Sequence, residues 1–177
     1  MRFTPTALPG VFVIEVEPKG DDRGLFARTY CREEFAAHGL CTNWMQCNVS
    51  FNTRVGTLRG MHWQSAPHEE VKLVRCTAGA AYDVVADARP DSPTYRKWIA
   101  VEITAANRKA VYIPGGYAHG FQTLVDGTEL FYQMSAFYVP EAARGARWND
   151  PTLGIEWPPH ENRVIAVRDL SFPDLPL

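Results

Sequence analysis

Short segments rich in β-branched and aromatic residues recur along this chain, and turn sequences separate them. The clearest are residues 11–17, 71–76, 80–87 and 129–138, and this composition favours β-strands. The turn sequences include PKGDDRG, ARPDSP, ITAANR, PGG and VDGT,. Only residues 32–39, REEFAAHG, have a helical pattern,. Strands at this spacing with so few helices indicate an all-β fold, either an antiparallel sandwich or a barrel.

The length of 177 residues and the hydrophobic share of 46% predict one compact domain, residues 1–177, around a single core. The residues from Trp157 onward are rich in proline, and we expect them to cross the surface as irregular structure. The four cysteines show no CxxC spacing and are too few for a disulfide scaffold,. We therefore expect reduced, structural thiols at Cys31, Cys41, Cys47 and Cys76.

The charge of the chain is nearly balanced, with 18 Lys and Arg residues against 20 Asp and Glu residues. A net charge of −2 creates no field that would gather nucleic acid or an anionic membrane, so an anionic ligand must be bound by locally placed cations. No segment approaches the roughly 20 apolar residues of a membrane span, and the first residues lack the apolar core of a signal peptide. We expect a cytoplasmic protein that binds neither nucleic acid nor membranes.

Polar side chains gather on one side of a predicted strand around residue 48. Gln46, Asn48 and Ser50 share that side, because strand side chains alternate with a period of two,. On one strand alone, such a face is most often a solvent face. Other polar residues also fall on predicted strands or strand ends, namely Arg59, His62, Lys72, His119 and Tyr132. The set predicts the polar-lined mouth of a barrel, where closed barrels commonly bind one small ligand.

Two segments each lead through glycines to a histidine. Gly56 is followed six positions later by His62, and Pro114-Gly115-Gly116 leads through a tight turn to His119,. In this spacing the two segments resemble the two cupin motifs. The metal-binding cupins carry His-x-His in the first motif, whereas this chain has Gln64 in place of the second imidazole. A divalent metal needs several imidazoles or carboxylates that converge. We therefore interpret the histidines as acid–base and hydrogen-bonding groups, assign no metal ligands, and keep a metal site of His62, His119 and Glu69 or Glu70 as the alternative.

Seven short motifs occur in order along nearly the whole chain. They are DRGLF (22–26), QxN (46–48), LRGMH (58–62), KLV (72–74), DSPTY (91–95), AHGF (118–121) and WNDP (148–151). In this set the chain resembles the dTDP-4-dehydrorhamnose 3,5-epimerase family. The resemblance implies a cupin-like double-stranded β-helix, or jelly-roll, barrel with few short helices. It also implies a homodimer that shares strands across its interface, a nucleotide-linked deoxy sugar as ligand, and no metal or organic cofactor.

The resemblance also implies roles for particular residues. His62 matches the base that removes a proton next to the sugar ketone, and Asp169 matches the carboxylate paired with that base, with Asp174 as the second candidate. Tyr132 matches the acid on the opposite face of the ring. The residues that match substrate contacts are Arg23, Phe26, Arg28, Gln46, Asn48, Arg59, Lys72, His119, Tyr138 and Arg168. Among these, the resemblance places Lys72 and His119 beside the reacting centre and Tyr138 against the nucleobase of the substrate.

These residue types suit the chemistry. A ketone at C4 acidifies the hydrogens on C3 and C5, so epimerisation needs a base, a group that stabilises the enolate oxygen, and an acid. Histidine, with a reference pKa of about 6.5, is the natural base near neutral pH. A carboxylate on its other nitrogen fixes the tautomer, and Lys72 supplies a cation for the developing oxyanion. No hydride leaves, so no nicotinamide is required.

The chain departs from the family at two positions. Arg28 and Ala143 stand where family members usually have glutamates that contact the nucleoside. At position 28 an arginine, which donates hydrogen bonds, replaces a glutamate, which accepts them, and this changes which nucleobase binds. We therefore expect the reaction to persist with a shifted nucleotide or sugar preference, unless Arg28 simply faces solvent. Inversion at C3 alone and inversion at both C3 and C5 stay open. The alternative functions are a metal-dependent cupin oxygenase or isomerase, a cupin ketoisomerase, and a sugar-nucleotide-binding cupin without activity.

Overall fold

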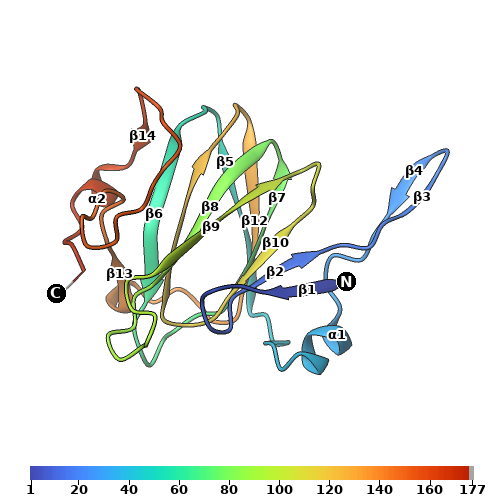
Figure 1. Cartoon of the computed structure of the whole chain (residues 1–177), viewed down its shortest axis with the longest axis horizontal. Helices are drawn as coiled ribbons and strands as arrows, with labels where there is room; N and C mark the ends of the chain where they lie inside the picture. The colour runs from blue at the N-terminus through green and yellow to red at the C-terminus, as the bar shows by residue number, and fades with distance from the viewer. Residues whose placement is uncertain (176–177) are drawn as a thin grey trace.

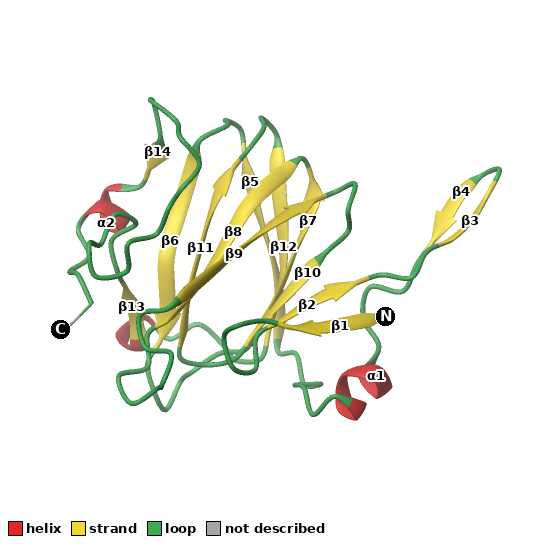
Figure 2. Ribbon diagram, viewed as in Figure 1, coloured by secondary structure: helices red, strands yellow, loops and turns green. Residues whose placement is uncertain are grey.

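Two antiparallel β-sheets face each other in the computed structural model, which describes residues 1–175 (Figures 1 and 2). The first sheet has the strand order β1-β2-β10-β7-β12-β5. Its strands are β1 (Arg2–Pro5), β2 (Phe12–Glu15), β10 (Ala110–Ile113), β7 (Lys72–Ala78), β12 (Thr128–Met134) and β5 (Gln46–Asn52). The second sheet has the order β13-β6-β11-β8-β9, and β14 runs parallel to β6. Its strands are β13 (Ala143–Gly145), β6 (Thr57–Gln64), β11 (Tyr117–Thr123), β8 (Ala80–Asp87), β9 (Trp98–Thr104) and β14 (Val164–Ile165).

The chain crosses between the sheets at most of the connections from β5 to β12, and only the step from β8 to β9 stays within one sheet. This alternation is that of a jelly-roll barrel. The helical elements are short: α1 (Arg32–Ala37), the 3-10 turn η1 (Pro140–Ala142) and α2 (Val167–Leu170). The expectation of an all-β, cupin-like fold with few short helices is confirmed.

An apolar core fills one part of the space between the sheets. Val74 and Leu130 reach it from the first sheet, Val85 and Phe121 reach it from the second, and all four are almost inaccessible to solvent. Burying a side chain of this size contributes roughly 1.5–3 kcal/mol. Tyr132 packs against the edge of this core, where the apolar filling gives way to a polar cavity.

Most of the predicted segments form the expected structure. Residues 80–87 form β8 as predicted, and the segments 11–17 and 71–76 contain β2 and most of β7. The predicted helix at residues 32–39 is α1, two residues shorter at its C-terminal end. The four cysteines are free thiols, as expected.

The strand predicted for residues 129–138 ends at Met134, so its second part is wrong. Residues 135–138 leave the sheet because their partners lie elsewhere. The backbone N–H of Ser135 donates to the carbonyl of Val71 at 3.0 Å, and the backbone N–H of Val139 donates to Oε1 of Gln64 at 2.6 Å. Aromatic residues occur both in strands and in the walls of cavities, so the composition of residues 135–138 does not distinguish a strand from a cavity wall.

The segment from Trp157 onward is less irregular than predicted. The backbone N–H of Val164 donates to the carbonyl of Gly56 at 3.0 Å, which fixes β14 beside β6, and α2 follows directly. Elements of two and four residues are too short to leave a periodic pattern in sequence. Long-range contacts hold this segment in place, and they position Asp169.

The hairpin of β3 (Lys19–Asp21) and β4 (Gly24–Phe26) projects away from both sheets (Figure 1). Phe26 at its base is 79% exposed, and the neighbouring Leu25 is 46% exposed. Within residues 1–175, no helix is long and apolar enough to cross a membrane.

Candidate active site

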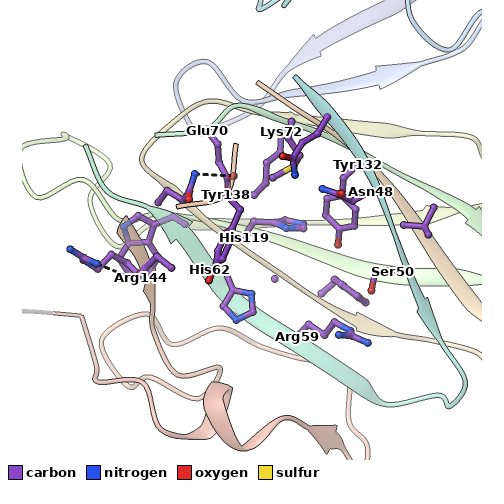
Figure 3. Close-up of a pocket in the computed structure, with 18 of the residues that line it drawn as sticks. Asn48, Ser50, Arg59, His62, Glu70, Lys72, His119, Tyr132, Tyr138 and Arg144 are labelled. Atoms are coloured by element: carbon purple, nitrogen blue, oxygen red, sulfur yellow. Dashed lines mark hydrogen bonds and ion pairs between the residues drawn. The ribbon is translucent and has the colours of Figure 1, made fainter. Parts of the chain in front are cut away.

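A cavity of about 500 Å³ opens between the two sheets (Figure 3). Side chains from β5, β7 and β12 form one wall, and side chains from β6, β11 and β13 form the other. The polar lining residues include Gln46, Asn48, Ser50, Arg59, His62, Glu70, Lys72, His119, Tyr132, Tyr138, Arg144 and Arg168. The polar face predicted on β5 and the polar residues predicted on neighbouring strands therefore meet around one space.

Two glycines bring β6 and β11 close together. A Cβ atom on Gly120 would lie 2.6 Å from Sδ of Met61 and 2.8 Å from the carbonyl oxygen of Arg59, and Gly60 has a φ of +117°. A larger residue at either position would push the strands apart. Because the strands approach this closely, His62 and His119 are direct cross-strand partners.

His62 forms a pair with Asp169. Nε2 of His62 lies 2.7 Å from Oδ1 of Asp169, and Oδ2 of the same carboxylate accepts the backbone N–H of Gly60 at 3.0 Å. Burial alone would raise the pKa of Asp169, but the hydrogen bond and charge of His62 and the N–H of Gly60 lower the pKa below its usual value,. The carboxylate is therefore ionised at neutral pH. Asp174, the second candidate, instead binds Arg147.

His119 forms a second pair, with Asp83 of β8. Nε2 of His119 lies 2.7 Å from Oδ2 of Asp83, and both side chains are buried. Tyr132 stands edge-on to the ring of His119, with the ring centroids 5.9 Å apart. Burial, with a smaller contribution from the charge of Asp83, raises the pKa of Tyr132 far above its usual value. Tyr132 therefore keeps its proton at all physiological pH values.

Lys72 and Glu70 form an ion pair at the cavity wall. Nζ of Lys72 lies 2.5 Å from Oε1 of Glu70, and the two side chains are 7% and 9% exposed. Burial lowers the pKa of Lys72 below its usual value, and the charge and hydrogen bond of Glu70 oppose that shift. Both residues line the cavity, so the pair places an ammonium group at the cavity wall.

Gln64 connects this region to the rim that carries Tyr138. Its Nε2 donates to the carbonyls of His68 at 2.9 Å and Phe137 at 3.1 Å, and its Oε1 accepts the backbone N–H of Val139 at 2.6 Å. An amide with these partners is occupied by backbone groups. Gln64 therefore ties the rim to β6.

Arginine side chains supply the positive charge at the cavity mouth. Nε of Arg59 donates to Oδ1 of Asn52 at 2.9 Å, which orients the guanidinium. Arg168 stacks over Phe172, and NH1 of Arg144 donates to the carbonyls of Glu141 and Ala143. A second cavity of about 320 Å³ shares Arg59, His62 and Arg168 with the first. Guanidinium groups in this position suit phosphate oxygens.

The structure brings most of the predicted site residues together. Those that line the cavity are Gln46, Asn48, Arg59, His62, Lys72, His119, Tyr132, Tyr138 and Arg168, and Asp169 stands behind His62. The exceptions are Arg23, Phe26 and Arg28, which lie on or next to the projecting hairpin. Arg23 pairs with Asp21, and Arg28 pairs with Glu34 at 2.8 Å. Within one chain, these three residues are not part of this cavity.

Some site residues have no role predicted from the sequence. They include Asp83 and Arg144, and Glu70 is a candidate only in the alternative metal site. Asp83 carries a signal that is visible in the sequence, since it is the one acidic residue inside the apolar strand AAYDVVA. Glu70 lies two residues before Lys72, a spacing that puts both on one face of an extended chain. Within residues 1–175, no three His, Cys, Asp or Glu side chains converge as a metal site.

Comparisons with known proteins agree with this arrangement. The family model for dTDP-4-dehydrorhamnose 3,5-epimerase matches residues 5–176. A dTDP-4-dehydrorhamnose 3,5-epimerase of Sinorhizobium fredii is 38% identical over 175 residues, covering 99% of this chain and 90% of that protein. A dTDP-4-dehydrorhamnose 3-epimerase of Streptomyces niveus is 38% identical over 159 residues, covering 89% and 76%. The crystal structure of a Bacillus anthracis dTDP-4-dehydrorhamnose 3,5-epimerase with TDP and PPi bound matches with a TM-score of 0.94 at 34% identity, over 98% of this chain and 99% of that one. The chain therefore belongs to the dTDP-4-dehydrorhamnose 3,5-epimerase family and is an isomerase.

Proposed function

We propose that this protein inverts C3, or both C3 and C5, of a nucleotide-linked 4-keto-6-deoxy sugar, which is dTDP-4-dehydro-6-deoxyglucose or a related NDP sugar. The observation that carries the proposal is the His62–Asp169 pair at the wall of a polar cavity. Tyr132 stands on the opposite sheet, so a sugar ring between the two would meet a base on one face and an acid on the other.

The mechanism follows from the contacts of each group. With Nε2–H donating to Asp169, Nδ1 of His62 is the nitrogen that takes the proton from the carbon next to the ketone. The carbon–hydrogen electron pair moves into an enolate, and the resulting oxyanion accepts hydrogen bonds from Lys72 and His119. Tyr132 then donates its phenolic proton to the same carbon from the opposite face, which inverts the centre. Solvent restores both proton carriers.

A homodimer is part of the proposal. The hairpin of β3 and β4 extends beyond the sheets and exposes Phe26, and a second copy of the chain would bury that ring. We propose that Arg23, Phe26 and Arg28 contribute to the substrate site of the second copy, because they do not reach the cavity of their own chain. The cytoplasmic location and the single domain stay predictions.

Deuterium exchange tests the reaction directly. The purified protein is incubated with the 4-keto-6-deoxy sugar nucleotide in D2O, and NMR follows label at C3 and C5. Incorporation is expected with the wild-type protein, and label at C3 alone would identify a 3-epimerase. Binding without incorporation would instead support a sugar-nucleotide-binding protein, and activity that chelators abolish would support a metal-dependent cupin.

The nucleotide preference is tested by offering dTDP-, CDP- and GDP-linked 4-keto sugars in parallel. Ala143 lines the cavity without any hydrogen-bonding side chain, and Arg28 is paired with Glu34. We propose that the preference differs from that of relatives with glutamates at both positions. A clear preference for the dTDP-linked sugar over the CDP- and GDP-linked sugars would contradict this part of the proposal.

A further inference from the structure

Glu70 is the only carboxylate among the described residues that line the main cavity. Its side chain is nearly as buried as that of Lys72, to which it is bound. A buried ion pair rarely adds net stability, because removing two charges from water costs about as much as their attraction returns. The position of this pair, at the wall of a ligand cavity, therefore favours a role in the site over a role in folding.

The ion pair decides the charge of Lys72. Without a counter-ion, a buried lysine loses its proton readily, because burial disfavours the ammonium form. Burial does lower the pKa of Lys72, and Glu70 is the group that opposes the shift. An ammonium group has three N–H donors, so pairing with Oε1 of Glu70 leaves donors for an oxygen of the ligand.

The other charged groups around the cavity do not replace Glu70. From β6 and β11 these groups are Arg59, His62 and His119, and Tyr132 of β12 keeps its proton. Arg144, Arg168 and Tyr138 lie on the segments that border the mouth. None of these side chains can carry a negative charge while Tyr132 keeps its proton, and a cation nearby makes it harder for Lys72 to stay protonated. The carboxylates of Asp83 and Asp169 are already paired with His119 and His62.

We propose that Glu70 is a positioning residue, which keeps Lys72 protonated and directed at the cavity so that Lys72 can stabilise the enolate oxygen. The inference rests on the proposed function for the role of Lys72. Gln64 supports the arrangement, since its Nε2 lies 3.4 Å from Oε2 of Glu70 and is itself held by backbone carbonyls. Oε1 of Glu70 binds Lys72 and Oε2 faces the Gln64 amide, so both carboxylate oxygens have a partner.

The first test measures the pKa of Lys72 without substrate. The chain has only four lysines, Lys19, Lys72, Lys97 and Lys109, so protein labelled with [13Cε]lysine gives few NMR signals, and Lys→Arg changes at the other three assign Lys72 by elimination. In Glu70→Gln the pKa of Lys72 should fall by roughly one to three pH units, the usual effect of losing an adjacent opposite charge. Glu70→Asp keeps the charge and should restore most of the value. Glu102→Gln, an exposed change on β9, should leave it unmoved.

The second test measures kcat/KM for deuterium incorporation between pH 6 and 10 in the same variants. Because kcat/KM reports ionisations of the free enzyme, the alkaline fall of Glu70→Gln should move to lower pH in step with the NMR titration. Activity of Glu70→Gln should come closest to that of the wild type at the acid end of this range, where protonation of Lys72 is most complete in both proteins.

Two results would overturn the proposal. One is an unchanged Lys72 titration in folded Glu70→Gln. The other is a shifted titration with a pH–rate profile that is lowered equally at every pH, because that pattern indicates a structural role alone. If the wild type exchanged no deuterium, the proposed function would fail, while the lysine titration would still decide whether Glu70 controls Lys72.

Discussion

Two histidine–aspartate pairs flank the same cavity, and they differ in how far the histidine is open to a ligand. Both pairs have a nitrogen–oxygen distance of 2.7 Å. The side chain of His62 is 42% exposed and that of His119 is 5% exposed, although the two histidines are cross-strand partners. One histidine–aspartate pair is thus open to a ligand, and the other is enclosed by the protein.

The two carboxylates also differ. Both oxygens of Asp169 accept hydrogen bonds, from His62 and from the N–H of Gly60. In the described part of the chain, Oδ1 of Asp83 has no hydrogen-bond partner, a costly condition for a buried carboxylate. The comparison teaches that a histidine–aspartate pair does not identify a base by itself. Access to the ligand and full support of the carboxylate distinguish His62 from His119.

The largest expected effect comes from replacing the histidines one at a time with asparagine. His62→Asn removes the accessible base, and deuterium incorporation should fall by roughly 10²- to 10⁴-fold, the range that a positioned base contributes. His119→Asn removes a buried hydrogen-bonding group and should cost less. NMR measures the exchange rate, and circular dichroism checks that both variants fold. Equal losses of deuterium exchange in the two folded variants would show that exposure does not distinguish the base, His62, from His119.

The next effect separates the two carboxylates. Asp169→Asn should lower kcat by about 10²-fold or more, because an amide that donates to Nε2 leaves the wrong tautomer of His62 facing the substrate. Asp83→Asn should act less on kcat, since we propose that its partner His119 donates a hydrogen bond and is not the base. Steady-state kinetics on both variants gives the comparison. A greater loss of kcat in Asp83→Asn would reverse the assignment of the two pairs.

A smaller effect on proton removal is expected from Tyr132→Phe. The ring still packs against the core, and His62 still removes the proton, so label should continue to enter the sugar. Net inversion should fall further than exchange, because delivery from the opposite face is lost. The two rates are compared on one sample by NMR. Loss of both signals in equal measure would count against Tyr132 as the acid.

The smallest effect concerns acid stability. The pKa of Asp169 is lowered in the folded protein, so its stabilising contribution is complete above the pKa of the unfolded chain, about 3.9. This contribution is lost as pH falls through the lower folded value. Urea unfolding of the wild type and Asp169→Asn should therefore show a stability difference that shrinks as the pH falls below 4. A difference that persists unchanged well below pH 4 would contradict the ionised carboxylate.

The sequence predicts the parts of this molecule that depend on short-range patterns. Alternation on β5 places Gln46 and Asn48 on one face, and the Pro-Gly-Gly turn precedes the strand that carries His119. Strands from both sheets then bring these residues to one cavity, as expected. Local periodicity and turn chemistry are sufficient for such features.

The remainder depends on contacts between distant segments. Asp169 and His62 are separated by 107 positions, and only the family resemblance pairs them in advance. The carboxylate of Asp83 and the amide of Gln64 find partners that no local pattern encodes. The placement of Arg23 and Arg28 outside the cavity is a property of the projecting hairpin, whose direction relative to the sheets no turn sequence specifies.

The way Gln64 holds the rim has a consequence for how such enzymes can diversify. Its amide forms hydrogen bonds with main-chain atoms of residues 137 and 139, and these bonds do not involve the side chain of Tyr138. The loop can therefore keep its course whichever side chain it presents to the ligand. An inherited or engineered exchange at position 138 would therefore change a side chain that lines the cavity while the backbone of the rim keeps its course.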